Sequence, residues 1–303
     1  MSKYMLKRFI ISIFTIWILI TIVFFLVRML PGDPFTSNKV TPEIAKNMMK
    51  YYGLDKPLHE QYFVFMKNLF RGDLGYSLRY SGRTVNQIIA DAFPRSADLG
   101  IRALIFAVIA GLMLGIVAAL NQNKNWDKLS MLIAILGISV PSFIVGALLQ
   151  YFFAVKLGWL PAAQWKGFAY TIMPSFALGL GTLALVARLM RASMLEIVNQ
   201  DYIKTAKAKG LTQTQITWKY QIRNAILPVV TILGPTVAYL TTGTFVVEQI
   251  FAIPGLGRHY VIAIQNLDYS LTLGLTIFFG SFLVLMNFVV DILYGVVDPR
   301  IRL

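Results

Sequence analysis

Long apolar runs alternate with short polar segments along most of the chain. The runs that we interpret as membrane-spanning helices are residues 9–27, 103–120, 129–155, 167–187, 224–247 and 269–290. Each run approaches or exceeds the roughly 20 apolar residues that an α-helix needs to cross the hydrocarbon core of a bilayer. The pattern therefore predicts an all-α membrane protein with six transmembrane helices and both termini on the same side.

Residues 31–98 form a long polar segment, which we expect to be a small helical insertion between the first two spans. A first helix is predicted to start at Thr41 and to stop at Gly53. A second helix should cover residues 57–70, where aromatic side chains recur on one face that we interpret as a packing surface.

A third helix of the insertion is predicted by a capping-box pair, Thr84 and Gln87. The apolar stripe that follows consists of Val85, Ile88, Ile89 and Ala92. We accordingly divide the chain into three parts, namely a tail with the first span (1–30), the insertion (31–98) and a five-helix core (99–303) that contains a cytoplasmic loop (196–226).

Basic residues predict the orientation, because lysine and arginine are concentrated in the short cytoplasmic loops of membrane proteins. The short segments on one side carry Lys3, Lys7, Arg8, Lys124, Lys128, Arg188, Arg191, Lys204, Lys207, Lys209, Lys219, Arg223, Arg300 and Arg302. The short loops on the opposite side carry only Lys156, Lys166 and Arg258. We therefore expect both termini in the cytoplasm and the insertion outside, since a segment of its length crosses largely regardless of charge.

Composition agrees with a polytopic membrane protein, because 57% of the residues are hydrophobic, 14% are charged and the mean hydropathy is +0.65. A formal charge of +14 also raises the question of nucleic acid. The basic residues flank apolar runs instead of forming one patch, so the lipid bilayer is the expected partner and nucleic acid is not.

Candidate catalytic and metal-binding residues are absent from the sequence. There is no cysteine, which excludes disulfides, thiolate catalysis and cysteine-based metal sites. His59 and His259 are the two histidines, and we interpret His59 beside Glu60 as a surface pair. No phosphate-binding loop of the form G-x-x-x-x-G-K-[ST] occurs, nor H-E-x-x-H or G-x-S-x-G. We therefore predict neither an enzyme nor a metal site.

The segment from Asp201 to Pro228 is a basic, amphipathic island between two apolar runs. Its pattern predicts two short helices around a glycine. The apolar positions of the first helix recur at helical spacing and are Leu195, Val198, Tyr202 and Ala206.

The boundary between these two helices is predicted at Gly210, since glycine adopts a positive φ without steric cost at a helix C-terminus. Thr212 and Gln215 have capping-box spacing, so a second helix can begin at once. Pro228 falls in the first turn of the next apolar run, where a missing N–H costs little.

Proline, glycine and polar residues inside the spans give candidates for a transport pathway. The candidates are Pro141, Gln150, Gly234, Pro235, Thr241 and Thr242, and we interpret Pro141 and the pair Gly234 and Pro235 as interruptions or bends beside the pathway. Tight helix packing is the alternative for the glycines, and hydrogen bonding within the residue's own helix is the alternative for the threonines. Asp291 is expected to form a structural pair with a nearby arginine or lysine.

The basic island also resembles a known element, the coupling ("EAA") loop of the dipeptide/oligopeptide/nickel branch of binding-protein-dependent ABC importers. The residues that carry the resemblance are Asp201, Tyr202, Thr205, Ala206, Ala208, Lys209, Gly210, Leu211, Arg223, Asn224, Ala225, Leu227 and Pro228. Lys204 and Thr205 stand where the general motif has Glu and its first Ala. Further similar segments, including RMLPGDPF near the start and DILYGVVDPRIRL at the end, extend the resemblance over essentially the whole chain.

The resemblance implies a six-span type I importer permease in a bacterial cell membrane. It implies a second homologous permease, two cytoplasmic ATPases and an extracytoplasmic peptide-binding protein as partners. ATP and Mg would be bound by the ATPases, with no cofactor on this chain. Transport of oligopeptides or dipeptides would follow alternating access, with the loop resting in a cleft of the ATPase.

Four alternatives remain open at this point. Nickel is the alternative substrate within the same branch, and the basic island alone also fits an ordinary cytoplasmic loop. A secondary transporter driven by an ion gradient would more often show inverted repeats and buried charges near the midplane, which we do not find. A membrane-embedded hydrolase is disfavoured because the sequence lacks a catalytic constellation.

Overall fold

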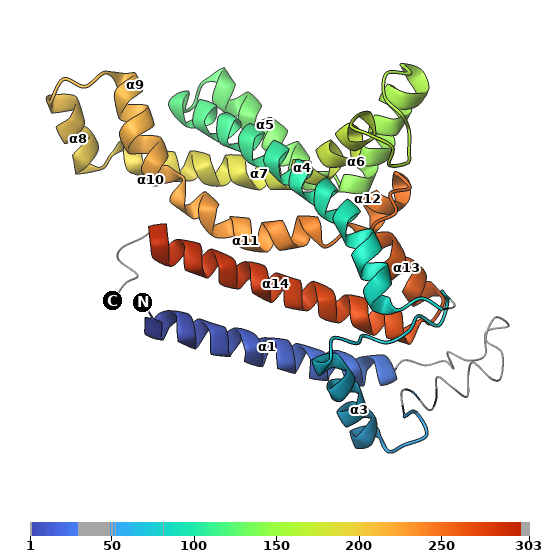
Figure 1. Cartoon of the computed structure of the whole chain (residues 1–303). Helices are drawn as coiled ribbons and strands as arrows, with labels where there is room; N and C mark the ends of the chain where they lie inside the picture. Colours follow the sequence, from blue (N-terminus) through green and yellow to red (C-terminus); the bar gives the residue numbers. More distant parts are fainter. Residues whose placement is uncertain (1, 30–48, 50, 52, 81, 298–303) are drawn as a thin grey trace.

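The computed structural model describes residues 2–29, 49, 51, 53–80 and 82–297, and this part of the chain is helical apart from its turns and one isolated bridge. Figure 1 shows the start of α1, the end of α14 and the helices α8 to α10 on one side of the molecule. Helices α3 and α13 lie on the opposite side. The helices of the basic island and the helices of the insertion and of the loop before α14 therefore lie at opposite ends of the spans, as the sequence predicts for a protein that crosses a membrane.

The first and last helices, α1 (Ser2–Arg28) and α14 (Tyr269–Val297), lie side by side (Figure 1). Phe24 of α1 is fully buried in a cluster with Leu273 and Ile277 of α14. At the other end of the pair, Arg8 forms an ion pair with Asp291 at 3.3 Å. The predicted structural pairing of Asp291 with a basic residue is confirmed.

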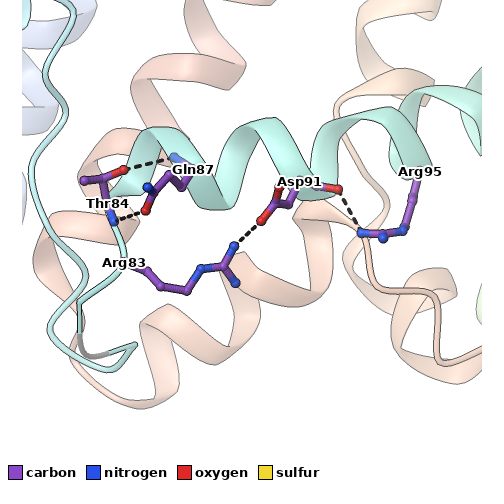
Figure 2. Close-up of polar contacts among 5 residues, drawn as sticks. All are labelled: Arg83, Thr84, Gln87, Asp91 and Arg95. Carbon is purple, nitrogen blue, oxygen red and sulfur yellow. Dashed lines mark hydrogen bonds and ion pairs between the residues drawn. The ribbon is translucent and has the colours of Figure 1, made fainter.

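Helix α4 (Val85–Leu120) is one continuous helix of 36 residues. The sequence predicts a short helix in the insertion and a separate span from residue 103, and this separation is wrong. Pro94 does not end the helix. The predicted capping box is present, since Thr84 Oγ1 accepts from Gln87 N at 3.1 Å and Gln87 Oε1 accepts from Thr84 N at 3.0 Å (Figure 2).

Helix α7 (Ala169–Val198) packs against α4 over most of its length, and small residues bring the two backbones together. A Cβ added to Gly111 would lie 2.7 Å from the carbonyl oxygen of Leu183, and one on Gly115 would lie 2.6 Å from that of Ala187. These distances are shorter than any normal contact, so the close approach requires glycine at both positions.

The predicted span at 129–155 is broken in two. Helix α5 (Asn125–Ser139) ends before Pro141. The second segment consists of α6 (Ser142–Leu149) and the π-helix that continues it (Gln150–Lys156), and it is bent by 103° relative to α5. Proline cannot donate to the preceding turn and disfavours helix at the residue before it, which explains the break. The predicted interruption at Pro141 is confirmed and amounts to a right-angled turn.

Helix α11 (Leu227–Thr241) runs without interruption through Gly234 and Pro235, so the span is not broken there. The break lies at Gly243 (φ +112°), and α12 (Phe245–Ile250) and α13 (Leu256–Gln265) follow. A Cβ on Gly234 would lie 2.7 Å from Val290 Cγ2, which makes this residue a packing glycine against α14.

Among the described residues, five helices are long and apolar enough to cross a membrane, and the bent pair makes a sixth if it is one span. The five are Met5–Arg28, Val85–Leu120, Ala169–Val198, Leu227–Ile250 and Tyr269–Ile292. The prediction of an all-α protein with six spans is confirmed on that count.

The described part of the insertion is held on the core by α3 (Leu58–Phe70) and by the loop after it. Tyr62 of α3 packs on Phe24 of α1, which confirms packing for that part of the aromatic face. The buried carboxylate of Asp268 accepts from the hydroxyl of Ser77 and from Arg79 N. Gly53, the predicted helix stop, has φ +61°, whereas the predicted start at Thr41 lies outside the described residues.

Candidate functional site

The basic island folds into a short helical hairpin between α7 and α11 (Figure 1). Helix α8 covers Asp201–Ala208 and α9 covers Gln213–Ile216. The second arm then continues as a π-helix (Thr217–Ile222) and as α10 (Arg223–Ala225). The predicted arrangement of two helices around a glycine is confirmed, although the second helix changes its hydrogen-bond pattern after one turn.

The turn between the two arms is a Schellman motif centred on Gly210. Gly210 has φ +75°, its N–H donates to Lys207 O at 3.0 Å, and Leu211 N donates to Ala206 O at 3.4 Å. Thr212 then caps α9, because its Oγ1 accepts from Gln215 N and Gln215 Oε1 accepts from Thr212 N at 3.0 Å. Both predicted caps of the island are confirmed.

The buried face of α8 differs from the predicted one. Ile203 and Ala206 are buried and pack with Ile216 of the second arm, whereas Tyr202 is 40% exposed. The predicted apolar line is correct at Ala206 and wrong at Tyr202, and it is not one continuous helix, because α7 ends at Val198 and α8 begins at Asp201.

The outer face of the hairpin is exposed and carries more basic than acidic residues. Its exposed residues include Asp201, Tyr202, Lys204, Thr205, Lys207, Ala208, Lys209, Gly210, Trp218, Lys219, Arg223 and Asn224. Desolvation by neighbouring residues raises the pKa of the Tyr202 phenol. The face therefore presents cations and two aromatic rings, and it includes most positions of the coupling-loop resemblance.

The inner side of the hairpin is anchored in the transmembrane helices. Ala225 of α10 and Val229 of α11 are buried against Met190 and Met194 at the end of α7. Pro228 lies in the first turn of α11, as predicted. A displacement of the hairpin would therefore act directly on α7 and α11.

A buried ion pair fixes the same end of α7 to α5. Arg191 donates from Nε to Asp127 Oδ1 at 2.6 Å and from Nη2 to Oδ2 at 2.7 Å. Asp127 Oδ2 also accepts from Asn123 N at 2.9 Å. Bidentate geometry of this kind holds both side chains in one orientation. No local sequence pattern indicates this pair, because its members are 64 residues apart.

Helices α7 and α11 also line an open cavity of about 430 Å³ that begins where α5 breaks. Its walls include Pro141 at the break, Thr182 of α7, and Pro235, Thr236 and Tyr239 of α11. Tyr239 is 68% exposed and was missed by sequence reasoning, since a single tyrosine in an apolar run carries no distinctive pattern.

The structure thus brings two of the pathway candidates, Pro141 and Pro235, to one cavity. Gly234 lies against α14 instead. Gln150 donates from Nε2 to Ala162 O at 2.7 Å and to Ile250 O at 3.1 Å. It therefore connects the start of the π-helix to the loop at Ala162 and to the end of α12.

The hydroxyls of the two threonine candidates stay within their own helix. Thr241 Oγ1 donates to Val237 O and Thr242 Oγ1 to Ala238 O, each at 2.7 Å. A role for any of the six candidates in a pathway stays a prediction.

A buried carboxylate organises the end of the molecule opposite the hairpin. Glu248 is fully buried and accepts from Ser96 Oγ at 2.7 Å and from Arg258 N at 3.1 Å, while Leu256 N donates to Ser96 Oγ at 2.8 Å. A Cβ on Gly255 would lie 2.4 Å from Ser96 Oγ. This network fastens the turn between α12 and α13 to α4. Within the described residues, no group of three or more metal-ligating side chains comes together.

Comparison with known proteins identifies the class. Residues 111–303 match the family described as the inner membrane component of binding-protein-dependent transport systems, and residues 1–100 match the N-terminal part of such membrane components. The chain belongs to this family of membrane permeases and is a multi-pass membrane protein.

Relatives of known name narrow the class to peptide permeases. The chain is 45% identical to the oligopeptide transport system permease protein OppB of Haemophilus influenzae, with both chains covered completely. It is also 45% identical to the dipeptide transport system permease protein DppB of Bacillus subtilis, over 100% of this chain and 99% of that protein. The resemblance to permeases of the dipeptide/oligopeptide/nickel branch of binding-protein-dependent ABC importers is therefore confirmed.

Solved structures confirm the fold. The MetNI methionine ABC transporter in an inward-facing conformation superposes with a TM-score of 0.55 at 19% identity, over 70% of this chain and 97% of that one. An amino acid ABC transporter crystallised with histidines gives a TM-score of 0.52 at 17% identity, over 71% and 94%. At these identities the likeness supports the type I importer permease fold alone.

Proposed function

We propose that this chain is a permease subunit of an ATP-driven importer that takes up oligopeptides or dipeptides. The observation that carries the proposal is the exposed hairpin of α8 and α9, because it is anchored to α7 and α11, two of the helices that line the cavity. The peptide substrate is inferred from the names of the relatives, which also favour peptide over nickel.

The proposed machine contains a second homologous permease, two cytoplasmic ATPases that bind ATP and Mg, and an extracytoplasmic peptide-binding protein. The hairpin docks on an ATPase, and closure of the ATPases on ATP moves it. Because α10 and α11 pack on the end of α7, the movement reaches the walls of the cavity. Nucleotide drives the change only by binding the two states with different affinity.

The proposed orientation places the hairpin and both termini in the cytoplasm, and α3 and α13 outside. The exposed cations of the hairpin support this assignment, since basic loops stay on the cytoplasmic side. The cavity then lies between the two sides, where substrate sites of transporters are commonly found.

Reconstitution tests the proposal. The chain, its partner permease, both ATPases and the binding protein are placed in proteoliposomes, and uptake of a labelled dipeptide, a labelled tetrapeptide and Ni²⁺ is measured with and without ATP. We expect ATP-dependent uptake of at least one peptide, and none when the ATPases are omitted. Uptake driven by a proton or sodium gradient without ATPases would contradict the proposal. Uptake of Ni²⁺ without uptake of either peptide would show that the substrate is nickel and not a peptide.

A further inference from the structure

A second, separate cavity lies between α4 and the first turns of α7. It is an open, mostly apolar groove of about 460 Å³, lined by Ile105 and Phe106 of α4, by Phe168 just before α7, and by Ile172 and Phe176 of α7. Thr171 and Ser175 of α7 also line it. The rings of Phe106 and Phe176 lie 5.1 Å apart. None of these residues lines the cavity at the break of α5, so the groove does not belong to the site already described.

The groove has a cation at one end. Arg102 lines it, and the guanidinium carbon lies 5.7 Å from the centre of the Phe168 ring. Arg102 donates from Nε to Asp98 at 2.9 Å, which leaves the two Nη groups of the guanidinium available to an anion. Lys166 is exposed and stands two residues before Phe168.

Arg102 and Lys166 are the last charged residues before the apolar stretches of α4 and α7. No charged residue follows Arg102 before the end of α4, and none lies between Lys166 and Arg188 on α7. The side chains along α4 beyond Arg102 are apolar and exposed, with Ile105, Ile109 and Met113 spaced by four residues. Apolar residues exposed on such a span face the hydrocarbon of the bilayer.

We propose that this groove binds one anionic phospholipid, with an acyl chain between α4 and α7 and the phosphate on Arg102. Arg102 pairs with Asp98, and the exposed Lys166, two residues before Phe168 in the chain, adds one further cation, so the local charge favours a lipid of net negative charge. An acyl chain matches the apolar walls, and the phosphate of a bilayer lipid lies at the depth where Arg102 ends the polar part of α4. The proposal needs only the membrane topology and does not rest on the transported substrate.

The test uses the chain purified from membranes together with the subunits that accompany it. The preparation is delipidated and titrated with phosphatidylglycerol or phosphatidylcholine, and bound lipid is counted by native mass spectrometry. Ile105→Trp fills the groove, whereas Ile109→Trp makes the same change one helical turn away, at a residue equally exposed but outside the lining. We expect one tightly held phosphatidylglycerol in the unchanged chain and in Ile109→Trp, and its loss in Ile105→Trp.

The contribution of charge is tested by Arg102→Gln, with Arg95→Gln as the control. Arg95 is an exposed cation of the same helix that donates to the main-chain oxygen of Asp91 at 2.8 Å, away from the groove (Figure 2). Arg102→Gln should weaken phosphatidylglycerol binding about five-fold and remove the preference over phosphatidylcholine, as loss of one cation at a membrane surface does. Arg95→Gln should change neither value.

Cysteine labelling gives an answer even if the tryptophan variant fails to assemble. Phosphatidylglycerol should protect Ile105→Cys, but not Ile109→Cys, from a maleimide. Equal lipid binding by Ile105→Trp and Ile109→Trp, or equal labelling of both cysteines in the presence of lipid, would overturn the proposal. Cross-linking of Ile105→Cys to another protein subunit would also overturn it, because a protein surface would then fill the groove.

Discussion

Replacement of Gly210 by valine tests whether the hairpin of α8 and α9 is the coupling element. Gly210 has φ +75°, and a Cβ built there meets no atom within 4 Å. The penalty for valine is therefore one of backbone conformation alone, about 1–2 kcal/mol for a β-branched residue with positive φ. A change of that size lowers the population of the native turn about 5- to 30-fold relative to its alternatives.

The alternative conformation follows from the hydrogen bonds of the turn. If residue 210 returns to negative φ, the bonds from Gly210 N to Lys207 O and from Leu211 N to Ala206 O are lost, and α8 tends to continue. The second arm would then leave its contact with Ile203 and Ala206. The transmembrane helices are untouched, so the variant should insert and assemble normally.

The assay compares peptide uptake with ATP hydrolysis in the reconstituted importer. Gly210→Val should lower uptake sharply, and ATP hydrolysis should lose its response to the loaded binding protein. Gly210→Asn is the matched control and should be milder, because asparagine adopts positive φ more readily than valine. Near-normal coupling in Gly210→Val would show that this glycine only punctuates a loop and that the hairpin is not the coupling element.

Two further predictions concern orientation and the inner end of α7. Single cysteines can be introduced into this cysteine-free chain and labelled with a reagent that does not cross the membrane. Glu60→Cys should be labelled from outside, whereas Trp126→Cys and Gln213→Cys should be labelled only from the cytoplasm. Labelling of Gln213→Cys from outside intact cells would reverse the proposed orientation. Asp127→Leu should destabilise the protein by about 1–3 kcal/mol, because it leaves the partly buried Arg191 guanidinium without its carboxylate partner, and thermal unfolding should show this as a lower midpoint. Combining Asp127→Leu with Arg191→Leu should recover most of the loss, and a double variant as unstable as the sum of the two single ones would argue against a direct pairing.

Signals that act within a few residues were readable from the sequence. The caps at Thr84 and Thr212 and the positive φ of Gly210 depend on neighbouring residues in the chain, and each was predicted correctly. The apolar spans were readable for a similar reason, because a helix in a bilayer satisfies its own backbone and needs only length and hydrophobicity.

Features that depend on packing between distant segments were not readable. Pro141 breaks its span whereas Pro235 lies within an intact helix, and nothing in the adjacent sequence separates the two cases. Gly234 was assigned to a bend because glycine permits both bending and close packing, and only the position of Val290 decides for packing. The cavity lies at the right-angled turn beside Pro141, and no sequence pattern indicates how large the angle of that turn is.

The pairing of α1 with α14 has a consequence for biosynthesis. A ribosome makes α1 first and α14 last, so Phe24 meets Leu273 and Ile277 only when nearly the whole chain has been translated. Until then α1 is covered by lipid, which it tolerates because its backbone bonds are internal. A premature stop before Tyr269 would thus leave the oldest helix of the chain packed on α3 but without α14, with the face that normally contacts Leu273 and Ile277 open to lipid.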